Sequence, residues 1–137
     1  MAKVVVRWIK SHLMVGTDSN GNSIVIGNIS DDEDYASGIK PSDLLLLAAA
    51  SCSIYDVVDI LKKQRESFNR LQVFCEGIQL DKPPYTFKTV HLHYMISGTV
   101  NAHKLQKAIK LSEEKYCAIL STIRPGVEIS SDYEICK

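Results

Sequence analysis

The first part of the chain alternates three short apolar stretches with turns. Residues 4–9 are rich in β-branched and aromatic side chains, and two further apolar runs cover residues 13–15 and 24–26. The pair Asn20-Gly21 before the last run is a strong signal for a tight hairpin turn. The pattern therefore predicts a meander of three strands.

A polar stretch then leads into the most apolar part of the chain. Residues 28–40 include an acidic cluster at 31–34 and are typical of a solvated surface loop. Pro41 has the fixed φ of a first helical turn, and Asp43 places a negative charge near the helix N-terminus. The Leu-rich and Ala-rich sequence that follows predicts the longest helix, ending at about Gln64.

The first half of this helix is apolar on almost every side. Between residues 44 and 54 only Ser51 and Ser53 are polar, so a single small sheet cannot cover it completely. We expect a second copy of the chain to provide the remaining cover. Asp56 and Asp59 interrupt the second half, which argues against a membrane span.

The second part of the chain predicts two paired strands, a helix and a last strand. Apolar and polar residues alternate over 71–80 and 86–96, with the turn residues 81–84 between them, which indicates an antiparallel pair. Asn101 is a suitable N-cap for a second helix that ends at 116–120.

A last alternating strand follows the break at Pro125-Gly126. The predicted class is α+β, in the order βββ-α-ββ-α-β, with residues 1–137 as one domain and no linker.

Composition narrows the possible partners and compartment. The 137 residues carry 16 basic and 16 acidic side chains, so no overall field attracts nucleic acid or an anionic membrane. The apolar run at the N-terminus is too short for a signal peptide. We therefore expect a protein of the cytoplasm that binds neither nucleic acid nor a membrane.

Four cysteines are the first candidates for chemistry. Their spacings contain no C-x-x-C pair and no zinc-ribbon pattern, so a special role requires two cysteines to meet in space. Cys52 lies midway along the apolar helix, with the Asp56 carboxylate one turn away, and both features favour an inert thiol over a reactive one. Cys117 is near two cations in sequence. Cys75 and Cys136 are interpreted as structural.

Two histidines could in principle hold a metal. His91 and His93 point to the same face of a strand, but no third ligand is identifiable, so a structural role is favoured and no metal is predicted. His12 and His103 are expected to be exposed. The chain has no P-loop, G-x-G-x-x-G, G-x-S-x-G or H-E-x-x-H motif, and no cofactor is predicted.

Three segments of the chain carry motifs that can be compared with a known family. GIKPSDLLLLAAASCSIYDVV at 38–58 has a proline at the start of the helix and a cysteine at the end of an alanine-rich run. It resembles the central helix of the OsmC/Ohr family of hydroperoxide reductases, in which that cysteine is reactive. ILKKQR at 60–65 resembles the continuation in the OsmC-like, YhfA-type branch, and LSEEKYC at 111–117 resembles the second cysteine site. The resemblance covers nearly the whole chain.

The resemblance implies an intertwined homodimer and a thiol peroxidase. Residues 1–35 would join the partner's sheet, and two central helices would pack back to back against curved antiparallel sheets. Cys52 would be the catalytic cysteine that attacks a small-molecule hydroperoxide, and Cys117 would close a disulfide that a dithiol reductant then opens.

The sequence departs from the family pattern at the residues that would activate the thiol. Ser42 followed by Asp43 stands where typical members have a glutamate, and Arg7 is the only arginine before Arg65. These three residues are the possible supporting side chains. The alternatives are a non-catalytic homodimer that binds a small apolar ligand and a redox sensor that turns over slowly.

Overall fold

The computed structural model describes residues 1–27 and 38–136, which form two compact units, Met1–Leu45 and Leu46–Lys137. The acidic cluster expected in a surface loop at 31–34 lies outside the described residues. The two units are considered separately.

The first unit contains the predicted meander. Strands β1 (Val5–Lys10), β2 (Leu13–Thr17) and β3 (Ser23–Ile26) pair antiparallel in that order. The second turn is organised by Asp18, whose Oδ1 accepts the backbone N–H groups of Asn20 at 2.9 Å and Asn22 at 2.8 Å. The three-strand prediction is confirmed.

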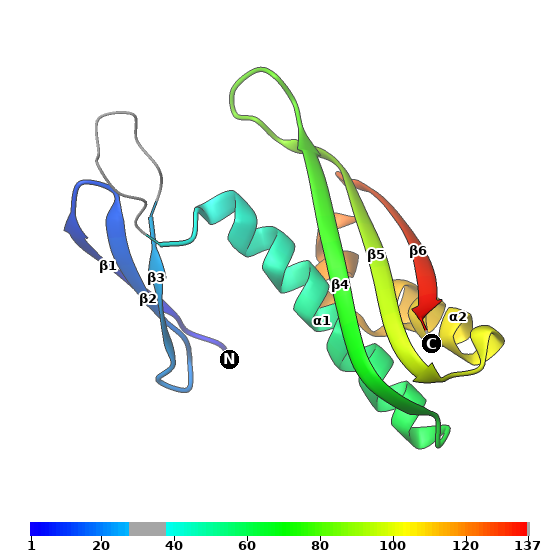
Figure 1. The fold of residues 1–137 in the computed structure, drawn as a ribbon. Coiled ribbons are helices and arrows are strands. Elements are labelled where there is room, and N and C mark those ends of the chain that lie inside the picture. Colours follow the sequence, from blue (N-terminus) through cyan, green and yellow to red (C-terminus); the bar gives the residue numbers. More distant parts are fainter. Residues whose placement is uncertain (28–37, 137) are drawn as a thin grey trace. The chain divides into compact units, whose positions relative to one another are not determined.

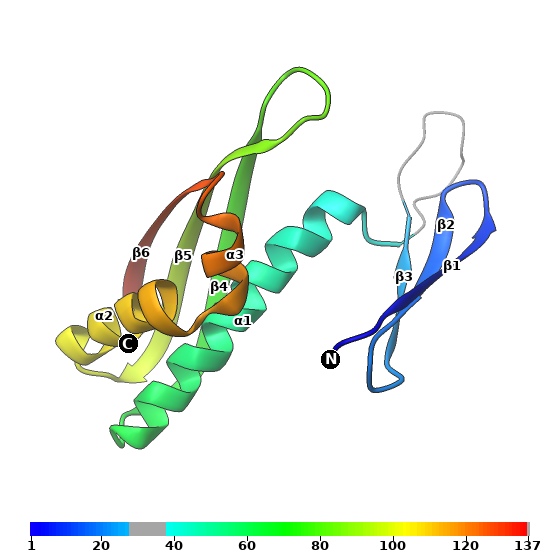
Figure 2. The ribbon, with the colours of Figure 1, turned by 180° about the vertical axis from the view of Figure 1, so that it is seen from behind.

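The second unit places all its helices on one face of a three-stranded sheet (Figures 1 and 2). The strands are β4 (Ser67–Gln79), β5 (Phe87–Thr99) and β6 (Glu128–Cys136), in the order β4-β5-β6. The helices are α1 (Pro41–Lys63), whose first turn belongs to the first unit, α2 (Ala102–Leu111), a π-helical turn η1 (Ser112–Tyr116) and α3 (Ala118–Ile123). The α+β class and the predicted order of strands and long helices are confirmed.

The sheet is mixed, and the expectation of purely antiparallel sheets is wrong. β4 and β5 are antiparallel, but β6 runs parallel to β5. The reason is the connection between them, because α2, η1 and α3 carry the chain back along the helical layer before β6 begins.

The core of this unit joins β5 to α1. Alternate residues of β5, among them Leu92 and Tyr94, have no exposed surface and face the helices. α1 contributes a buried stripe at intervals of four residues: Ala49, Ser53, Val57 and Leu61. Gly77 on β4 leaves room for neighbouring side chains, since a Cβ there would lie 2.9 Å from the Leu46 side chain on α1 and closer still to the Phe87 ring on β5.

The remaining surface of α1 is not enclosed within the described chain. Leu47 is 52% exposed and Tyr55 is 71% exposed. By length and hydropathy α1 could cross a membrane, a test that the core helix of a soluble protein also passes. The cover predicted from a second subunit stays a prediction.

The second predicted helix is interrupted, so the expectation that Cys117 lies within a helix is wrong. Asn101 caps α2 as predicted, with its side chain accepting the Lys104 N–H at 3.0 Å. The helix then widens into η1, and Cys117 adopts an extended conformation (φ −75°, ψ 106°). The Cys117 sulfur accepts the Leu120 N–H at 3.4 Å, which makes this residue the N-cap of α3.

Candidate redox site

The break at Cys117 places its sulfur beside one turn of α1. The sulfur atoms of Cys52 and Cys117 and a carboxylate oxygen of Asp56 all lie within 4.8 Å of one another. Cys52 and Asp56 share a helix face because they are four residues apart, and Cys117 comes from the connection between η1 and α3. Three side chains from distant parts of the sequence thus form one cluster.

The two thiols of the cluster have different environments. Cys117 is fully buried, whereas Cys52 is partly exposed. Burial, the largest cause, and the hydrogen bond with Cys52 together raise the pKa of Cys117 to about 11, despite the lowering effect of the Leu120 N–H. A thiol with this pKa is ionised in roughly one molecule in ten thousand at pH 7. Cys117 is therefore a poor first nucleophile.

A buried chain of hydroxyl groups supports the cluster. The Ser112 hydroxyl lies 3.0 Å from Oδ2 of Asp56, to which it donates, and 3.4 Å from Ser53 Oγ. Ser53 is in turn hydrogen-bonded to the Tyr94 hydroxyl on β5. Burial, the largest cause, raises the pKa of Tyr94, so its hydroxyl stays protonated. The chain ties α1 to both the sheet and η1.

Sequence reasoning missed the role of this hydroxyl chain. In the sequence, Ser53 stands out only as a polar exception in an apolar run, and no pattern singles out Ser112. A serine inside an otherwise buried helical stripe is the signal that was available, because buried hydroxyls need partners.

The cations near Cys117 in sequence have other partners in the structure. Lys115 Nζ lies 5.4 Å from the centre of the Tyr116 ring, and the Arg124 guanidinium donates to the backbone carbonyl of Glu113. Neither cation is among the main influences on the raised pKa of Cys117, which are burial and contacts with Leu120 and Cys52.

The supporting residues proposed from the family pattern belong to the first unit. Arg7 lies on β1 opposite Val15, and Ser42 and Asp43 lie in the first turn of α1. Asp43 forms an ion pair of 3.8 Å with Lys40. Their part in the thiol site stays a prediction.

A surface depression of about 490 Å³ lies next to the cluster. Asp56 forms part of its wall, together with Asp59 one turn along α1 and Tyr116, which precedes Cys117. Gln64 also lines it, and its buried Oε1 has no hydrogen-bond partner. The depression therefore provides a polar approach to the Asp56 carboxylate.

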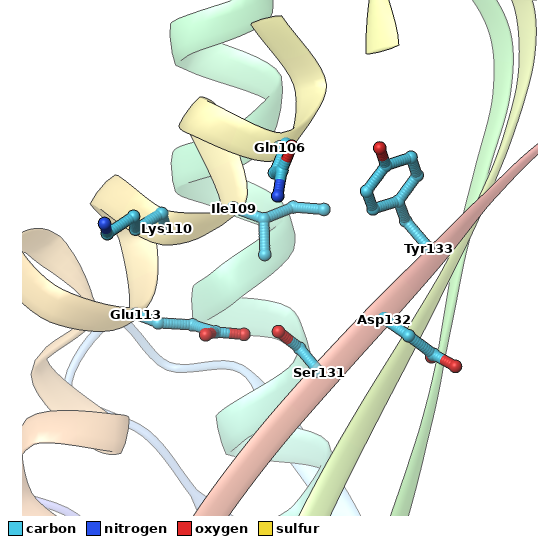
Figure 3. Close-up of a pocket in the computed structure, with 7 residues that line it drawn as sticks. All are labelled: Gln106, Ile109, Lys110, Glu113, Ser131, Asp132 and Tyr133. Carbon is cyan, nitrogen blue, oxygen red and sulfur yellow. The ribbon is translucent and has the colours of Figure 1, made fainter. Parts of the chain in front are cut away.

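A second depression of about 420 Å³ lies between α2 and β6 (Figure 3). The Glu113 side chain points from η1 toward Ser131 of β6. Burial raises the pKa of Glu113, although its hydrogen bond with Ser131 and the charge of Arg124 act in the opposite direction. This carboxyl is half-buried and has one oxygen, Oε1, without a hydrogen-bond partner.

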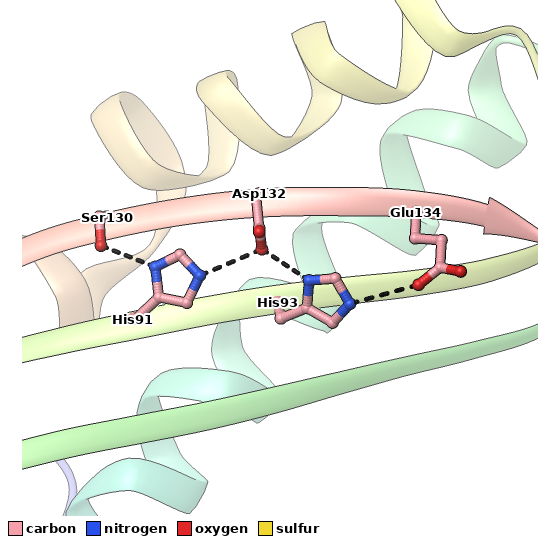
Figure 4. A network of polar contacts seen from close by, with 5 residues as sticks. All are labelled: His91, His93, Ser130, Asp132 and Glu134. Carbon is pink, nitrogen blue, oxygen red and sulfur yellow. Dashed lines mark hydrogen bonds and ion pairs between the residues drawn. The ribbon is translucent and has the colours of Figure 1, made fainter.

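The two strand histidines form a polar network on the sheet (Figure 4). Oδ1 of Asp132 lies 3.1 Å from His91 Nε2 and 2.6 Å from His93 Nδ1, and Ser130 Oγ lies 2.7 Å from His91 Nδ1. The hydrogen bond to Asp132 raises the pKa of His93 and lowers that of Asp132.

The network supports the structural interpretation of these histidines, and Asp132 was missed as their partner. The parallel register places Asp132 opposite His93, which the sequence pattern of β6 alone did not reveal. His12 and His103 are exposed as expected.

The other two cysteines lie on the strands. Cys75 on β4 packs against the core, and burial raises its pKa. Cys136 is the last residue of β6 and is partly buried. Both fit the structural interpretation.

Comparison with known proteins decides the family. The model of the family described as OsmC-like protein matches residues 31–132. The chain belongs to the OsmC-like family. One curated relative is "Protein YhfA" of Escherichia coli (strain K12). The two sequences are 28% identical over 131 residues, and the alignment covers 95% of each chain.

Solved structures agree with this OsmC-like fold. An OsmC-like protein from Mycoplasma pneumoniae superimposes with a TM-score of 0.85 over 100% of this chain and 98% of its own, at 14% identity. The organic hydroperoxide resistance protein OhrB of Bacillus subtilis is more distant, with a TM-score of 0.64, 16% identity and 98% coverage of each chain. At these identities the likeness shows the fold alone.

Proposed function

We propose that this OsmC-like protein is a thiol-dependent peroxidase that uses Cys52 and Cys117 as its catalytic pair. The observation that carries the proposal is the proximity of the two sulfurs, within 4.8 Å, together with their unequal burial. A partly exposed thiol can meet a dissolved substrate, and a buried thiol beside it is protected until the first has reacted.

The proposed reaction has two steps on the protein. The Cys52 thiolate attacks the terminal oxygen of the hydroperoxide, the O–O bond breaks, and the alkoxide takes a proton and leaves as an alcohol. Cys117 then attacks the resulting sulfenic acid, a disulfide forms, and water leaves. An external dithiol reduces the disulfide and becomes a disulfide itself.

Asp56 has a defined task in the second step. Because Cys117 holds its proton tightly, a base must accept that proton as the new S–S bond forms. The Asp56 carboxylate lies within 4.8 Å of the Cys117 sulfur, and Ser112 fixes its orientation. We assign Asp56 as the acceptor that passes the proton to the leaving hydroxide.

Organic hydroperoxides are the proposed substrates, and a homodimer is the proposed form. A distant structural neighbour is named as an organic hydroperoxide resistance protein, which supports this substrate class. The exposed side chains of Leu47 and Tyr55 on α1, and of Trp8 on β1, offer apolar surface that a second subunit would cover. We propose a cytoplasmic location for this dimer.

Peroxide consumption by the reduced protein tests the proposal. Organic hydroperoxide and a dithiol are supplied in excess, and the rate of peroxide loss is compared among wild type, Cys52→Ser, Cys117→Ser and Cys75→Ser. We expect Cys52→Ser to abolish the reaction, Cys117→Ser to slow turnover with a dithiol, and Cys75→Ser to resemble wild type. An unchanged rate in Cys52→Ser refutes the proposal.

The second candidate is a slow redox sensor with the same disulfide. The raised pKa of Cys117, about 11 and due mainly to burial, favours it, because a second thiol that is rarely ionised slows each cycle. Steady-state rates with several dithiol donors separate the candidates, since a sensor forms the disulfide once and turns over slowly with every donor. A measured Cys52 pKa well above neutrality, with no disulfide formed, indicates instead a non-catalytic dimer that binds a small apolar ligand.

A further inference from the structure

The Cys52, Asp56 and Cys117 cluster has the ligand set and the size of a metal site. Its two sulfur atoms and one carboxylate oxygen lie within 4.8 Å of one another. Two thiolates bound to one tetrahedral zinc ion at about 2.3 Å lie roughly 3.8 Å apart, so shifts of about 1 Å suffice to close the site.

We propose that the reduced protein binds one zinc ion through Cys52, Asp56 and Cys117, with a fourth position left open. Sulfur ligands select a soft or borderline cation over magnesium or calcium, and a mixed set of sulfur and oxygen ligands suits tetrahedral zinc. The spacing of the cysteines in the sequence does not indicate this site, because Cys52 and Asp56 lie on α1 whereas Cys117 lies at the distant junction of η1 and α3.

The surroundings of the cluster meet the further requirements of a metal site. Ser112 donates to Oδ2 of Asp56 at 3.0 Å and so orients the carboxylate from outside the ligand set. The depression of about 490 Å³ beside Asp56 gives an entry path, and its wall carries the Asp59 carboxylate together with the Lys63 ammonium.

Zinc at this position bonds both sulfurs and therefore protects them from peroxide. The binding itself is not a redox step: each thiol loses a proton as its sulfur binds the ion, and no electrons are transferred. The inference does not depend on peroxidase activity, because it requires only the reduced cluster.

Cobalt and zinc titrations of the reduced, full-length protein test the inference. Cobalt(II) is used because a thiolate-to-metal charge-transfer band reports sulfur ligands directly, and zinc is then measured by displacement of cobalt and by competition with a chelator. We expect one equivalent of cobalt, a thiolate band in wild type, and loss of that band in Cys52→Ser and in Cys117→Ser. Cys75→Ser is the matched thiol control.

Carboxylate variants distinguish the site from general attraction of cations. Asp56→Asn should weaken zinc binding by about 100-fold, whereas Asp59→Asn, one turn along the same helix, should change it less than threefold, and Ser112→Ala should weaken it by about 10-fold. Circular dichroism confirms that each variant is folded.

The histidine network on the sheet is the competing site. The double variant His91→Asn/His93→Asn should retain full affinity and the thiolate band. Binding without that band, or affinity lost in the histidine variant and kept in both cysteine variants, overturns the inference. Failure of peroxidase activity with zinc binding intact would refute only the proposed function.

Discussion

The buried hydroxyl pair between Ser53 on α1 and Tyr94 on β5 makes a strong prediction about stability. Both residues have no exposed surface, and the Tyr94 hydroxyl has Ser53 as its hydrogen-bond partner. Ser53→Ala therefore leaves the tyrosine hydroxyl buried without a partner. Tyr94→Phe has a milder effect, because Ser53 keeps Ser112 Oγ at 3.4 Å.

The expected magnitudes follow from the cost of an unpaired buried group. Ser53→Ala should lower the free energy of unfolding by about 2 kcal/mol, within a range of roughly 1–3, and Tyr94→Phe by about 1 kcal/mol. The double variant removes both hydroxyls and leaves neither orphaned. Its cost should be about 1 kcal/mol, so the two substitutions are non-additive by roughly 2 kcal/mol.

Urea unfolding followed by far-ultraviolet circular dichroism measures this cycle. All four proteins are compared under reducing conditions and at one protein concentration, because association of subunits shifts apparent stability. The wild-type slope with denaturant should be retained in each variant. Additive single effects, or a Ser53→Ala protein as stable as wild type, would refute the reasoning.

Three further predictions concern the histidines, the thiols and the cap of α2. Asp132→Asn should lower the pKa of His93 measured by nuclear magnetic resonance, because the Asp132 hydrogen bond is the largest cause of its elevation. Because folding raises the pKa of His93, protonated His93 stabilises the folded protein fully below its ordinary pKa of 6.5, and this stabilisation disappears as the pH rises through the folded pKa. The free energy of unfolding should therefore depend less on pH in Asp132→Asn than in wild type. Iodoacetamide at pH 7 should modify Cys52 well before Cys117, which is buried and has a pKa of about 11, and peptide mapping that finds Cys117 alkylated first would contradict this. Asn101→Ala removes the acceptor for the Lys104 N–H and should cost about 1 kcal/mol in thermal unfolding, with the exposed Asn20→Ala as a control for general loss of asparagine. Equal melting temperatures for wild type and Asn101→Ala would argue against the cap.

Local patterns predicted most of the secondary structure because each depends on neighbouring residues. The alternation along β4 and β5, the Pro41 start of α1 and the Asn101 cap all act within a few positions of the chain. The direction of β6 was missed for the opposite reason, since its parallel pairing with β5 is set by the path of the connecting helices.

The candidate site was predicted only in part. The resemblance identified Cys52 and Cys117, and the structure brings their sulfurs together. The conformation of Cys117 was missed because helical spacing continues through η1, and only the backbone reveals the break. Asp56 was recognised as a neighbour of Cys52, but its contact with Ser112 depends on how η1 packs against α1.

Disulfide mapping after a single turnover tests the central claim most directly. Reduced protein is treated with one equivalent of an organic hydroperoxide, quenched with an alkylating agent, digested without reductant and analysed by mass spectrometry. We predict one dominant disulfide, between Cys52 and Cys117, with Cys75 and Cys136 alkylated. Recovery of Cys52 and Cys117 as alkylated thiols while the peroxide persists would contradict the account.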